Sequence, residues 1–266
     1  MSENSRKRID VQRKSSHEIE IMAEAGAITA AARDKAAEMM APGVSTLEID
    51  RAAEQVIRDA GAEPSFKGFR GYPASICVEI NDIIVHGIPG DDLVIQDGDV
   101  VGVDVGAYYK GFHGDSATTV AVGQVSDDAL KLMDATRTSL DLAINQARAG
   151  NTIGDISRAI DEYITPLGYG IVTRLLGHGI GREMHEPPQV PNYYKEGAFA
   201  EYDLTLRPGM VLAIEPMINM GTPDVRPDPD GWTVRTADGQ LSVHFEHTVA
   251  ITKDEPRILT LTTRGD

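Results

Sequence analysis

An internal repeat constrains the fold of this chain more than any other feature of its sequence. The segment GVSTLEIDRA at 43–52 aligns with GNTIGDISRA at 150–159. Farther on, GDVVGVD at 98–104 aligns with GMVLAIE at 209–215, and the tripeptide HGI occurs at 86–88 and at 178–180. One such match arises easily by chance, but three in the same order indicate a duplicated unit. We therefore predict two related halves arranged about a pseudo-two-fold axis.

Helices and strands alternate in blocks along both halves. Capping boxes begin at Ser15 and Ser45, and apolar residues then recur at helical spacing to about 39 and 60. The helical period returns from about 127 to 150 and again from 152 to about 166. β-rich runs separated by turn residues lie at 75–122 and at 210–252. This order predicts an α+β fold built from two α/β halves.

Composition and charge exclude several classes of protein. The chain has 266 residues, enough to bury a large core. Its 25 basic and 41 acidic residues give a net charge of −16, which disfavours binding to DNA or other phosphate backbones. Cys77 is the only cysteine, which excludes an intrachain disulfide and favours the cytoplasm. No uninterrupted apolar run is long enough for a membrane span, so we expect no membrane partner.

The first residues differ from the rest of the chain. Residues 1–16 contain five basic side chains and no following apolar core, so we predict a flexible polar tail there and not a signal peptide. Residues 17–266 are then expected to form a single domain. The basic tail would suit a transient contact with ribosomal RNA. A polar stretch at 192–206 is expected to be a long surface loop.

Four acidic residues interrupt apolar β-rich runs. Asp104 and Asp115 flank a turn at Lys110-Gly111, and a four-residue loop would place the two carboxylates directly opposite each other. Glu215 and Glu246 lie in the corresponding runs of the second half. A solvated hairpin would explain the first pair alone. Four carboxylates pointing inward from apolar strands, however, require cations to neutralise them.

A histidine adds a nitrogen donor to this acidic set. His178 lies in GHGIG, where the missing side chains of the flanking glycines would let a cation approach closely. An oxygen-rich set with one imidazole suits Mn, Fe, Co or Zn, and two metals would share bridging carboxylates. The residues therefore predict a dinuclear metal site made of Asp104, Asp115, His178, Glu215 and Glu246.

At these residues the sequence resembles the bacterial type I methionine aminopeptidases from about residue 17 onwards. The matching blocks are RGYPASICVEINDIIVHGIP, DGDVVGVDV, GFHGD, GHGIGREMHEPPQV, LRPGMVLAIEP and FEHT, in the order of that family. The resemblance implies the pita-bread (creatinase/aminopeptidase) fold, in which two α/β halves share a curved antiparallel sheet. It also implies hydrolytic removal of the initiator methionine from nascent polypeptides, with a small residue preferred after the methionine.

The resemblance also assigns roles at the metal site. Asp104, Asp115 and Glu246 would hold one divalent cation (Co, Mn, Fe or Zn), and Asp115, His178, Glu215 and Glu246 would hold the other. Glu215 would act as the proton shuttle. His86 and His185 would be catalytic and contact the substrate, His185 at the scissile amide and His86 at the developing tetrahedral charge.

The same resemblance implies an apolar pocket for the methionine side chain. Its substrate-binding residues would be His86, His185, Phe66, Phe69, Tyr72, Cys77, Met184 and Trp232. Phe66 and Met184 depart from the cysteine and phenylalanine expected in bacterial members, so the pocket shape would differ. Cys77 would be a pocket wall and not a nucleophile. A monovalent cation, Na or K, would lie near Asn81, Ile83 and Ser242.

Two other functions remain open on sequence grounds. Xaa-Pro aminopeptidases and prolidases present the same ligand types, although they usually carry a large N-terminal domain for which the residues before Asp104 leave little room. A catalytically silent pita-bread binding module would also keep the fold, but such a relative is expected to lose its ligands. A monomer is expected by default.

Overall fold

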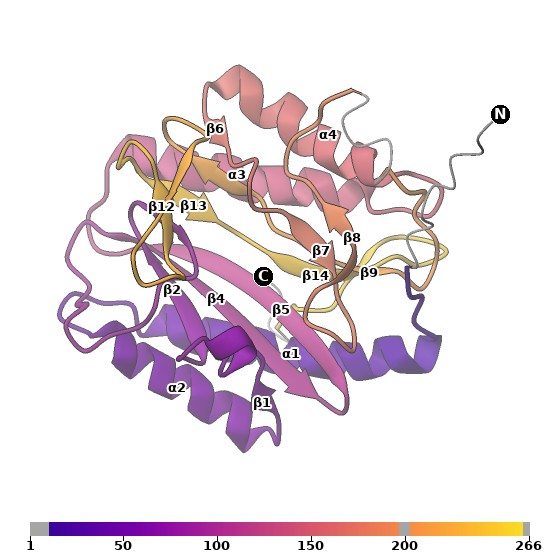
Figure 1. Cartoon of the computed structure of the whole chain (residues 1–266), viewed down its shortest axis with the longest axis horizontal. Helices are drawn as coiled ribbons and strands as arrows, with labels where there is room; N and C mark the ends of the chain where they lie inside the picture. The colour runs from indigo at the N-terminus through magenta and orange to yellow at the C-terminus, as the bar shows by residue number, and fades with distance from the viewer. Residues whose placement is uncertain (1–10, 197–202, 263–266) are drawn as a thin grey trace.

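Two pairs of helices lie on opposite sides of a central set of strands (Figure 1). The computed structural model describes residues 11–196 and 203–262. The helices are α1 (Ser16–Glu38), α2 (Thr46–Asp59), α3 (Asp127–Gln146) and α4 (Ile153–Ile164), with 3-10 turns η1 (Phe69–Gly71) and η2 (Thr165–Leu167). The strands of the first half are β1 (Glu63–Pro64), β2 (Ile76–Ile80), β3 (Ile83–Val85), β4 (Val100–Tyr109) and β5 (Phe112–Ala121).

The strands of the second half are shorter and more numerous. They are β6 (Gly170–Ile171), β7 (Gly177–Gly179), β8 (Glu186–Val190), β9 (Val211–Ile214), β10 (Met217–Asn219), β11 (Val225–Pro227), β12 (Val234–Thr236), β13 (Ser242–His244), β14 (His247–Ala250) and β15 (Arg257–Ile258). β1, β4 and β2 pair in that order and β5 pairs with β4, while β15, β14, β9, β7 and β8 form a second sheet. Two three-stranded sheets, β13-β10-β6 and β11-β12-β3, complete the antiparallel framework.

The predicted helix starts are confirmed. At Ser15 the side chain accepts from Glu18 N at 3.3 Å while the Glu18 carboxylate accepts from Ser15 N, and Ser45 makes the same reciprocal cap for α2. Thr152 caps α4 with Asp155 in the same way. Each box satisfies backbone N–H groups that the first helical turn leaves unpaired.

The predicted repeat is visible in the backbone. Gly43 and Gly150 precede α2 and α4 with φ of +91° and +101°, and Gly98 and Gly209 precede β4 and β9 with φ of +94° and +96°. These left-handed conformations favour glycine in both halves. The N–H groups of Gly43 and Gly150 also make equivalent long-range hydrogen bonds, to Ile95 O and Leu206 O. The two halves therefore share one local architecture.

Each half has its own hydrophobic core. In the first, the buried faces of α1 and α2 pack on β2 and β4 through residues such as Ile49, Ile57 and Val103. In the second, α3 and α4 pack on β9, β10, β13 and β14, with Leu132 and Ile160 fully buried. The seam between the halves lies along β5, β13 and β14. Burial of these two separate apolar faces fixes where the seam strands meet.

The predicted pairing of Asp104 with Asp115 is wrong by two residues. β4 and β5 close through a two-residue loop in which Lys110 and Gly111 have φ of 49° and 88°, so Asp104 pairs with Ala117 and Asp115 with Gly106. Two consecutive positive φ values are typical of the type I′ turn that matches the twist of a tight hairpin. Because alternate residues share a face, the two carboxylates are still diagonal neighbours.

The long runs predicted at 210–218 and 242–252 each divide into two strands. β9 ends at Ile214 and β10 begins at Met217, since Pro216 has no N–H to continue the ladder. β13 ends at His244 and β14 begins at His247. Ile214 pairs with His247 and Met217 with His244, so the two interruptions lie opposite each other. Glu215 and Glu246 occupy these facing gaps.

The N-terminal segment contacts the body of the protein at Lys14. Residues 1–10 lie outside the described part of the chain, so the predicted tail is described only from residue 11 onwards. There, Lys14 is buried and its Nζ lies 2.5 Å from Glu186 Oε2, while Lys14 N donates to Gly209 O at 2.6 Å. The tail prediction therefore does not hold at Lys14, where a buried counter-charge fixes the chain. The domain boundary itself stays a prediction.

Replacing Lys14 with methionine is expected to destabilise the protein by about 3 kcal/mol, because it leaves the Glu186 carboxylate buried without its cation. Chemical denaturation followed by circular dichroism measures the change. Lys131→Met is the matched control, since the Lys131–Asp128 pair is exposed and its loss should leave stability unchanged. Equal stability of the Lys14→Met variant and the unmodified protein would contradict the expected role of the pair.

Within residues 11–196 and 203–262, no helix is both long and apolar enough to cross a membrane. The predicted surface loop at 192–206 falls partly on residues 197–202, which lie outside the described residues. Its far end returns to the fold through a bridge between Thr205 and Thr152.

Candidate metal centre and substrate pocket

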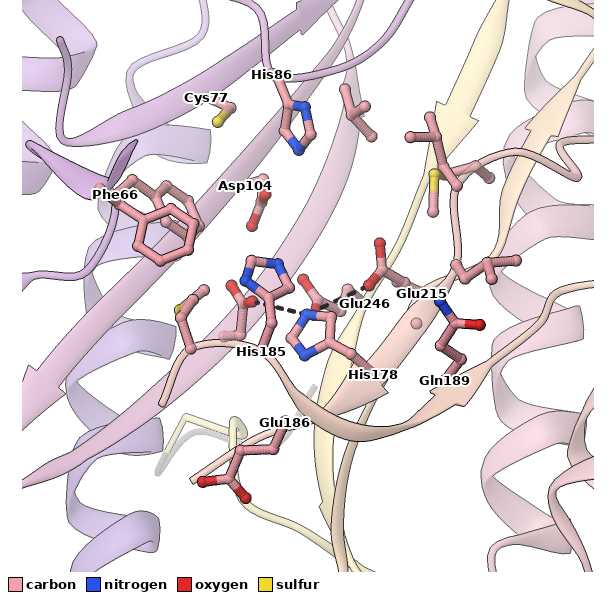
Figure 2. A pocket seen from close by; sticks show the side chains of 18 of the residues that line it. Phe66, Cys77, His86, Asp104, His178, His185, Glu186, Gln189, Glu215 and Glu246 are labelled. Atoms are coloured by element: carbon pink, nitrogen blue, oxygen red, sulfur yellow. Dashed lines mark ion pairs between the residues drawn. The ribbon is translucent and has the colours of Figure 1, made fainter. Parts of the chain in front are cut away.

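A cavity of about 640 Å³ opens between the two halves and gathers chemistry from both. Its lining includes the five predicted metal ligands, the two predicted catalytic histidines and all the predicted residues of the methionine pocket. Figure 2 shows several of these side chains pointing into the same space, among them Asp104, His178, Glu215 and Glu246. The structure therefore brings together residues that are up to about 180 positions apart in the sequence.

The strands at and beside the seam position the predicted metal ligands. Asp104 lies on β4, Asp115 on β5 and His178 on β7, and Glu215 and Glu246 occupy the facing interruptions of the second half. Glu246 N donates to Ala117 O at 3.0 Å, which ties the second interruption to β5. Each half thus contributes two carboxylates, and the second half adds the imidazole.

His178 is oriented with its unprotonated nitrogen toward the carboxylates. Its Nδ1 lies 2.9 Å from Gly179 O, which can only accept, so Nδ1 carries the hydrogen. Nε2 lies 3.7 Å from Asp115 Oδ2 and 3.6 Å from Glu215 Oε1, the ion pairs dashed in Figure 2. Burial lowers the pKa of His178 to about 3, so its Nε2 lone pair faces carboxylate oxygens at neutral pH. This arrangement suits a cation between them.

The carboxylates are held in surroundings that oppose their ionisation. Burial raises the pKa of Asp104 to about 7 and that of Glu215 to about 8. Burial and the nearby charge of Asp104 raise the pKa of Asp115 well above its usual value. Burial and the nearby charge of Asp115 do the same for the pKa of Glu246. Neutralisation by protons or by metal ions is the way such a cluster is stabilised.

Unpaired buried atoms support a fit to metal ions. Asp104 Oδ1, Asp115 Oδ1 and Glu246 Oε1 are buried and have no hydrogen-bond partner among the described residues. Asp115, His178 and Glu246 offer ligand atoms that all lie within 4.8 Å of one another. Orphaned acceptors of this kind are rare in folded proteins unless an ion or water satisfies them. The donor set of carboxylates and one imidazole fits hard to borderline divalent cations.

The glycines beside His178 have a different role from the one predicted. A Cβ on Gly177 would lie 2.5 Å from Ala213 O, and one on Gly179 would lie 2.3 Å from Pro187 O. Both glycines therefore let β7 pack closely against β9 and β8. The interpretation that they clear space for a cation is wrong, because neighbouring backbone fills that space.

The two predicted catalytic histidines line the same cavity as the carboxylates. The ring centroids of His185 and His178 are 4.3 Å apart, and the His185 side chain lines the cavity. His86 follows β3 with φ of 59° and contacts Trp232, whose ring centroid is 6.5 Å from its own. Burial lowers the pKa of His86 to about 4 and also lowers that of His185. Both rings are therefore neutral at physiological pH.

The predicted methionine pocket forms an apolar cluster separate from the two cores. Phe66, Tyr72, Cys77 and Met184 are buried together, with Phe69 and Trp232 packed against them. Tyr72 and Trp232 meet edge to face at 5.1 Å. This wall of aromatic and sulfur-containing side chains suits a flexible thioether. The burial of Cys77 raises its pKa well above the usual value, which disfavours a nucleophilic thiolate.

The residues predicted to bind a monovalent cation lie outside the cavity lining. Ser242 N donates to Asn81 O at 2.8 Å, so two of the three are direct neighbours. Asn81 has φ of 55°, and its side chain bonds Asp99 and Val100 N. Ile83 begins β3, two residues after Asn81.

Sequence reasoning missed several charged or polar residues in and around the cavity. Arg70, Arg174 and Glu186 line it directly. His244 is buried with Glu79 close to Glu215. The segment SVHFEHT contains both His244 and Glu246, so the alternation of a strand could have placed them on one face.

Comparisons with known proteins agree with this geometry. A model of metallopeptidase family M24 matches residues 20–253. The methionine aminopeptidase of Clostridium acetobutylicum is 46% identical over 93% of this chain and 98% of its own length. Methionine aminopeptidase 1 of Mycobacterium tuberculosis is 48% identical over 94% of this chain and 95% of its own length.

Solved structures show the same relationship. The crystal structure of methionine aminopeptidase from Thermotoga maritima superposes with a TM-score of 0.91 at 39% identity, covering 94% of this chain and 99% of that one. The prolidase from Pyrococcus furiosus gives a TM-score of 0.75 at 27% identity, and only 66% of its length is covered. These matches confirm the predicted pita-bread fold, and they favour the aminopeptidases over the prolidases in both identity and coverage.

Proposed function

The chain belongs to metallopeptidase family M24, and within it to the methionine aminopeptidases, which remove the initiator methionine. From this premise we propose how its residues perform that hydrolysis. The observation that carries the proposal is the meeting of four carboxylates and one imidazole beside an apolar pocket in a single cavity. A chain that cleaves after an N-terminal methionine needs both parts next to each other.

The division of the ligands between two cations follows from the resemblance to the methionine aminopeptidases. Asp104, Asp115 and Glu246 would hold one divalent cation, and Asp115, His178, Glu215 and Glu246 would hold the other, so Asp115 and Glu246 would serve both. The three unpaired carboxylate oxygens support this assignment. Two cations bound there, from among Co, Mn, Fe and Zn, would supply Lewis acidity and a water of lowered pKa.

The remaining chemistry belongs to the side chains. Glu215 would take a proton from the attacking water and return one to the departing amine, a role supported by its carboxylate lining the cavity beside His178. Neutral His185 donates a hydrogen bond to the scissile amide, and neutral His86 donates to the oxygen on which negative charge develops. Both rings are supported in these roles by their lowered pKa values, which keep them uncharged.

The apolar cluster provides specificity. Phe66, Phe69, Tyr72, Cys77, Met184 and Trp232 would enclose the methionine side chain. A small residue after the methionine is the preference that the likeness to the methionine aminopeptidases implies. A longer second side chain would displace the amide from the donors, which accounts for the proposed preference.

Replacing His185 with alanine is expected to lower kcat about 10²-fold while two cations per chain remain bound, because His185 contacts the substrate and no cation. Steady-state hydrolysis of a Met-Ala-Ser tripeptide measures the first effect, and elemental analysis of the purified protein measures the second. Loss of metal in the variant would contradict the assignment of His185. Exposed His17→Ala is the matched control and should leave both quantities unchanged.

Other properties follow as proposals from the composition and the relatives. The enzyme would act in the cytoplasm as a monomer. The basic residues among 1–13 would support a transient contact with the ribosome near emerging chains. A sodium or potassium ion bound at Asn81, Ile83 and Ser242 would brace the seam between β3 and β13, a role supported by the Ser242 N to Asn81 O hydrogen bond.

The substrate test compares Met-Ala-Ser with Ala-Pro-Ser. Metal-free protein receives Mn(II), Fe(II), Co(II) or Zn(II) in turn, and the released amino acid is quantified. Release of methionine alone supports the proposal. Release of alanine alone from the Xaa-Pro peptide would assign the same site to a prolidase-like reaction, and no release from folded, metal-loaded protein would point to a binding role.

A further inference from the structure

A buried carboxylate–imidazole pair lies beside Glu215 and is not used in the reaction proposed above. Glu79 and His244 are only 4% and 2% exposed. His244 Nδ1 lies 3.2 Å from Glu79 Oε1 and 3.3 Å from Glu79 Oε2. The Glu79 carboxylate and Nδ1 share one proton across this contact, so Glu79 fixes this side of the imidazole ring. The other ring nitrogen, Nε2, is then left to interact elsewhere.

That second nitrogen points toward the metal centre. His244 Nε2 is buried, has no hydrogen-bond partner among the described residues, and lies 3.9 Å from Glu215 Oε2. The other oxygen of the same carboxylate, Oε1, lies 3.6 Å from His178 Nε2. Glu215 is therefore flanked by an imidazole on each of its oxygens. His178 faces it with a lone pair. His244 Nε2 faces an oxygen that accepts, so it suits this position only with a hydrogen on Nε2, while Nδ1 and the Glu79 carboxylate share a further proton.

The strands are built to accommodate the pair. Glu79 on β2 pairs with Gly102 on β4, and Gly102 pairs with Thr119 on β5. A Cβ on Gly102 would lie 2.4 Å from Glu79 Oε2, so the glycine provides the space that the carboxylate occupies. Thr119 Oγ1 donates to His244 O at 2.6 Å and accepts from His244 N at 3.3 Å. Gly102 and Thr119, which pair across β4 and β5, thus fix Glu79 and His244 in place.

Charge explains why the two residues occur together. An ionised Glu79 in this position would be costly alone, and so would a protonated His244. Together they are neutral overall, so the pair adds no net charge to an already acidic cluster. What it adds is a directed N–H group next to Glu215. Partners that hold a ligating or catalytic side chain in this way commonly change metal affinity or activity 10- to 100-fold when they are removed.

We propose that His244, held by Glu79, is a positioning residue that directs its Nε2–H to Glu215 Oε2 and fixes the orientation in which Glu215 transfers protons. This inference rests on the function proposed above, because it assigns a role relative to Glu215. It adds two residues, one from each half, to the machinery of the reaction.

The test uses full-length, metal-loaded protein and four variants. His244→Leu removes the donor at similar volume, and His244→Gln restores an amide N–H. Glu79→Gln removes the charge that holds the imidazole. Gly102→Ala keeps both side chains of the pair but forces the Glu79 carboxylate out of its place. The measurements are kcat and KM for Met-Ala-Ser, the number of cations bound per chain, and the visible absorption spectrum of the Co(II)-loaded protein.

The expected result is a selective loss of turnover. In His244→Leu, kcat falls about 10- to 100-fold, KM changes by less than about 3-fold and two cations remain bound, while the Co(II) spectrum shifts. His244→Gln recovers most of kcat. Glu79→Gln and Gly102→Ala lower kcat in the same direction, and the double variant Glu79→Gln/His244→Leu loses no more than His244→Leu alone. Should His244→Leu not fold, Gly102→Ala and His244→Gln still decide the question.

Three outcomes overturn the inference. An unchanged kcat in folded His244→Leu would show that the pair only fills space. Loss of one cation in that variant would make His244 a metal ligand. Additive effects of Glu79→Gln and His244→Leu would show that the two residues act separately. If the unmodified protein itself releases no methionine with any metal, the proposed function fails first, and that result is distinct from all three.

Discussion

Replacing Glu246 with glutamine is expected to lower methionine release by about 10³-fold or more while making the metal-free protein more stable. The activity falls because Glu246 is a proposed bridge between two cations, and a loss of about 4 kcal/mol of transition-state stabilisation corresponds to about 10³-fold. Stability rises because the variant no longer has to neutralise a buried carboxylate beside Asp115. Peptide hydrolysis and urea denaturation in chelator measure the two effects.

The opposite effects on activity and on stability distinguish this prediction from that for a structural residue. A residue that merely supports the fold would lose activity and stability together when it is replaced. Glu183→Gln is the matched control, because its side chain is exposed near the site, and neither quantity should change. Retention of full activity by Glu246→Gln would remove Glu246 from the metal centre.

The metal-free protein is expected to lose about 3 kcal/mol of stability between pH 6.5 and pH 8. The pKa values of Asp104 and Glu215 are raised to about 7 and about 8 in the fold, whereas both groups ionise near pH 4 in the unfolded chain. The folded state therefore holds more protons in this window, so stability falls as the pH rises through the folded pKa values. His244 adds to the decline, since its pKa is raised to about 9.

Groups whose pKa values are lowered in the fold do not affect stability between pH 6.5 and pH 8. Burial lowers the pKa values of His178 and His86, and their effect on stability appears only below about pH 6.5. Urea midpoints in chelator at pH 6.5 and pH 8 give the slope. Addition of Mn(II) should abolish the decline, because bound cations replace the protons. A metal-free protein whose stability rises or stays constant across this range would show that these carboxylates are not forced together by the fold.

Much of the fold could be predicted from local signals. The capping boxes at Ser15 and Ser45 fixed the helix starts, because they depend on residues only three positions apart. The repeat predicted two equivalent halves, and its glycines occupy equivalent left-handed positions. The same order of carboxylates in both halves predicted the set that lines the cavity.

The remaining differences come from interactions that a linear pattern does not encode. The register of the β4–β5 hairpin depended on the left-handed conformations of Lys110 and Gly111, which shortened the loop. The burial of Lys14 depended on Glu186, a partner in another part of the chain. Likewise, the relation of Glu79 to His244 became visible only once the seam had brought the two halves together.

The most direct test of the account counts cations and methionine in one experiment. Chelator-treated protein is titrated with Co(II) under anaerobic conditions, and bound metal per chain is measured alongside methionine released from Met-Ala-Ser. The account predicts no release from the metal-free protein and release that returns as metal binds, with binding complete at two cations per chain. Undiminished release from protein shown to be free of metal would contradict it.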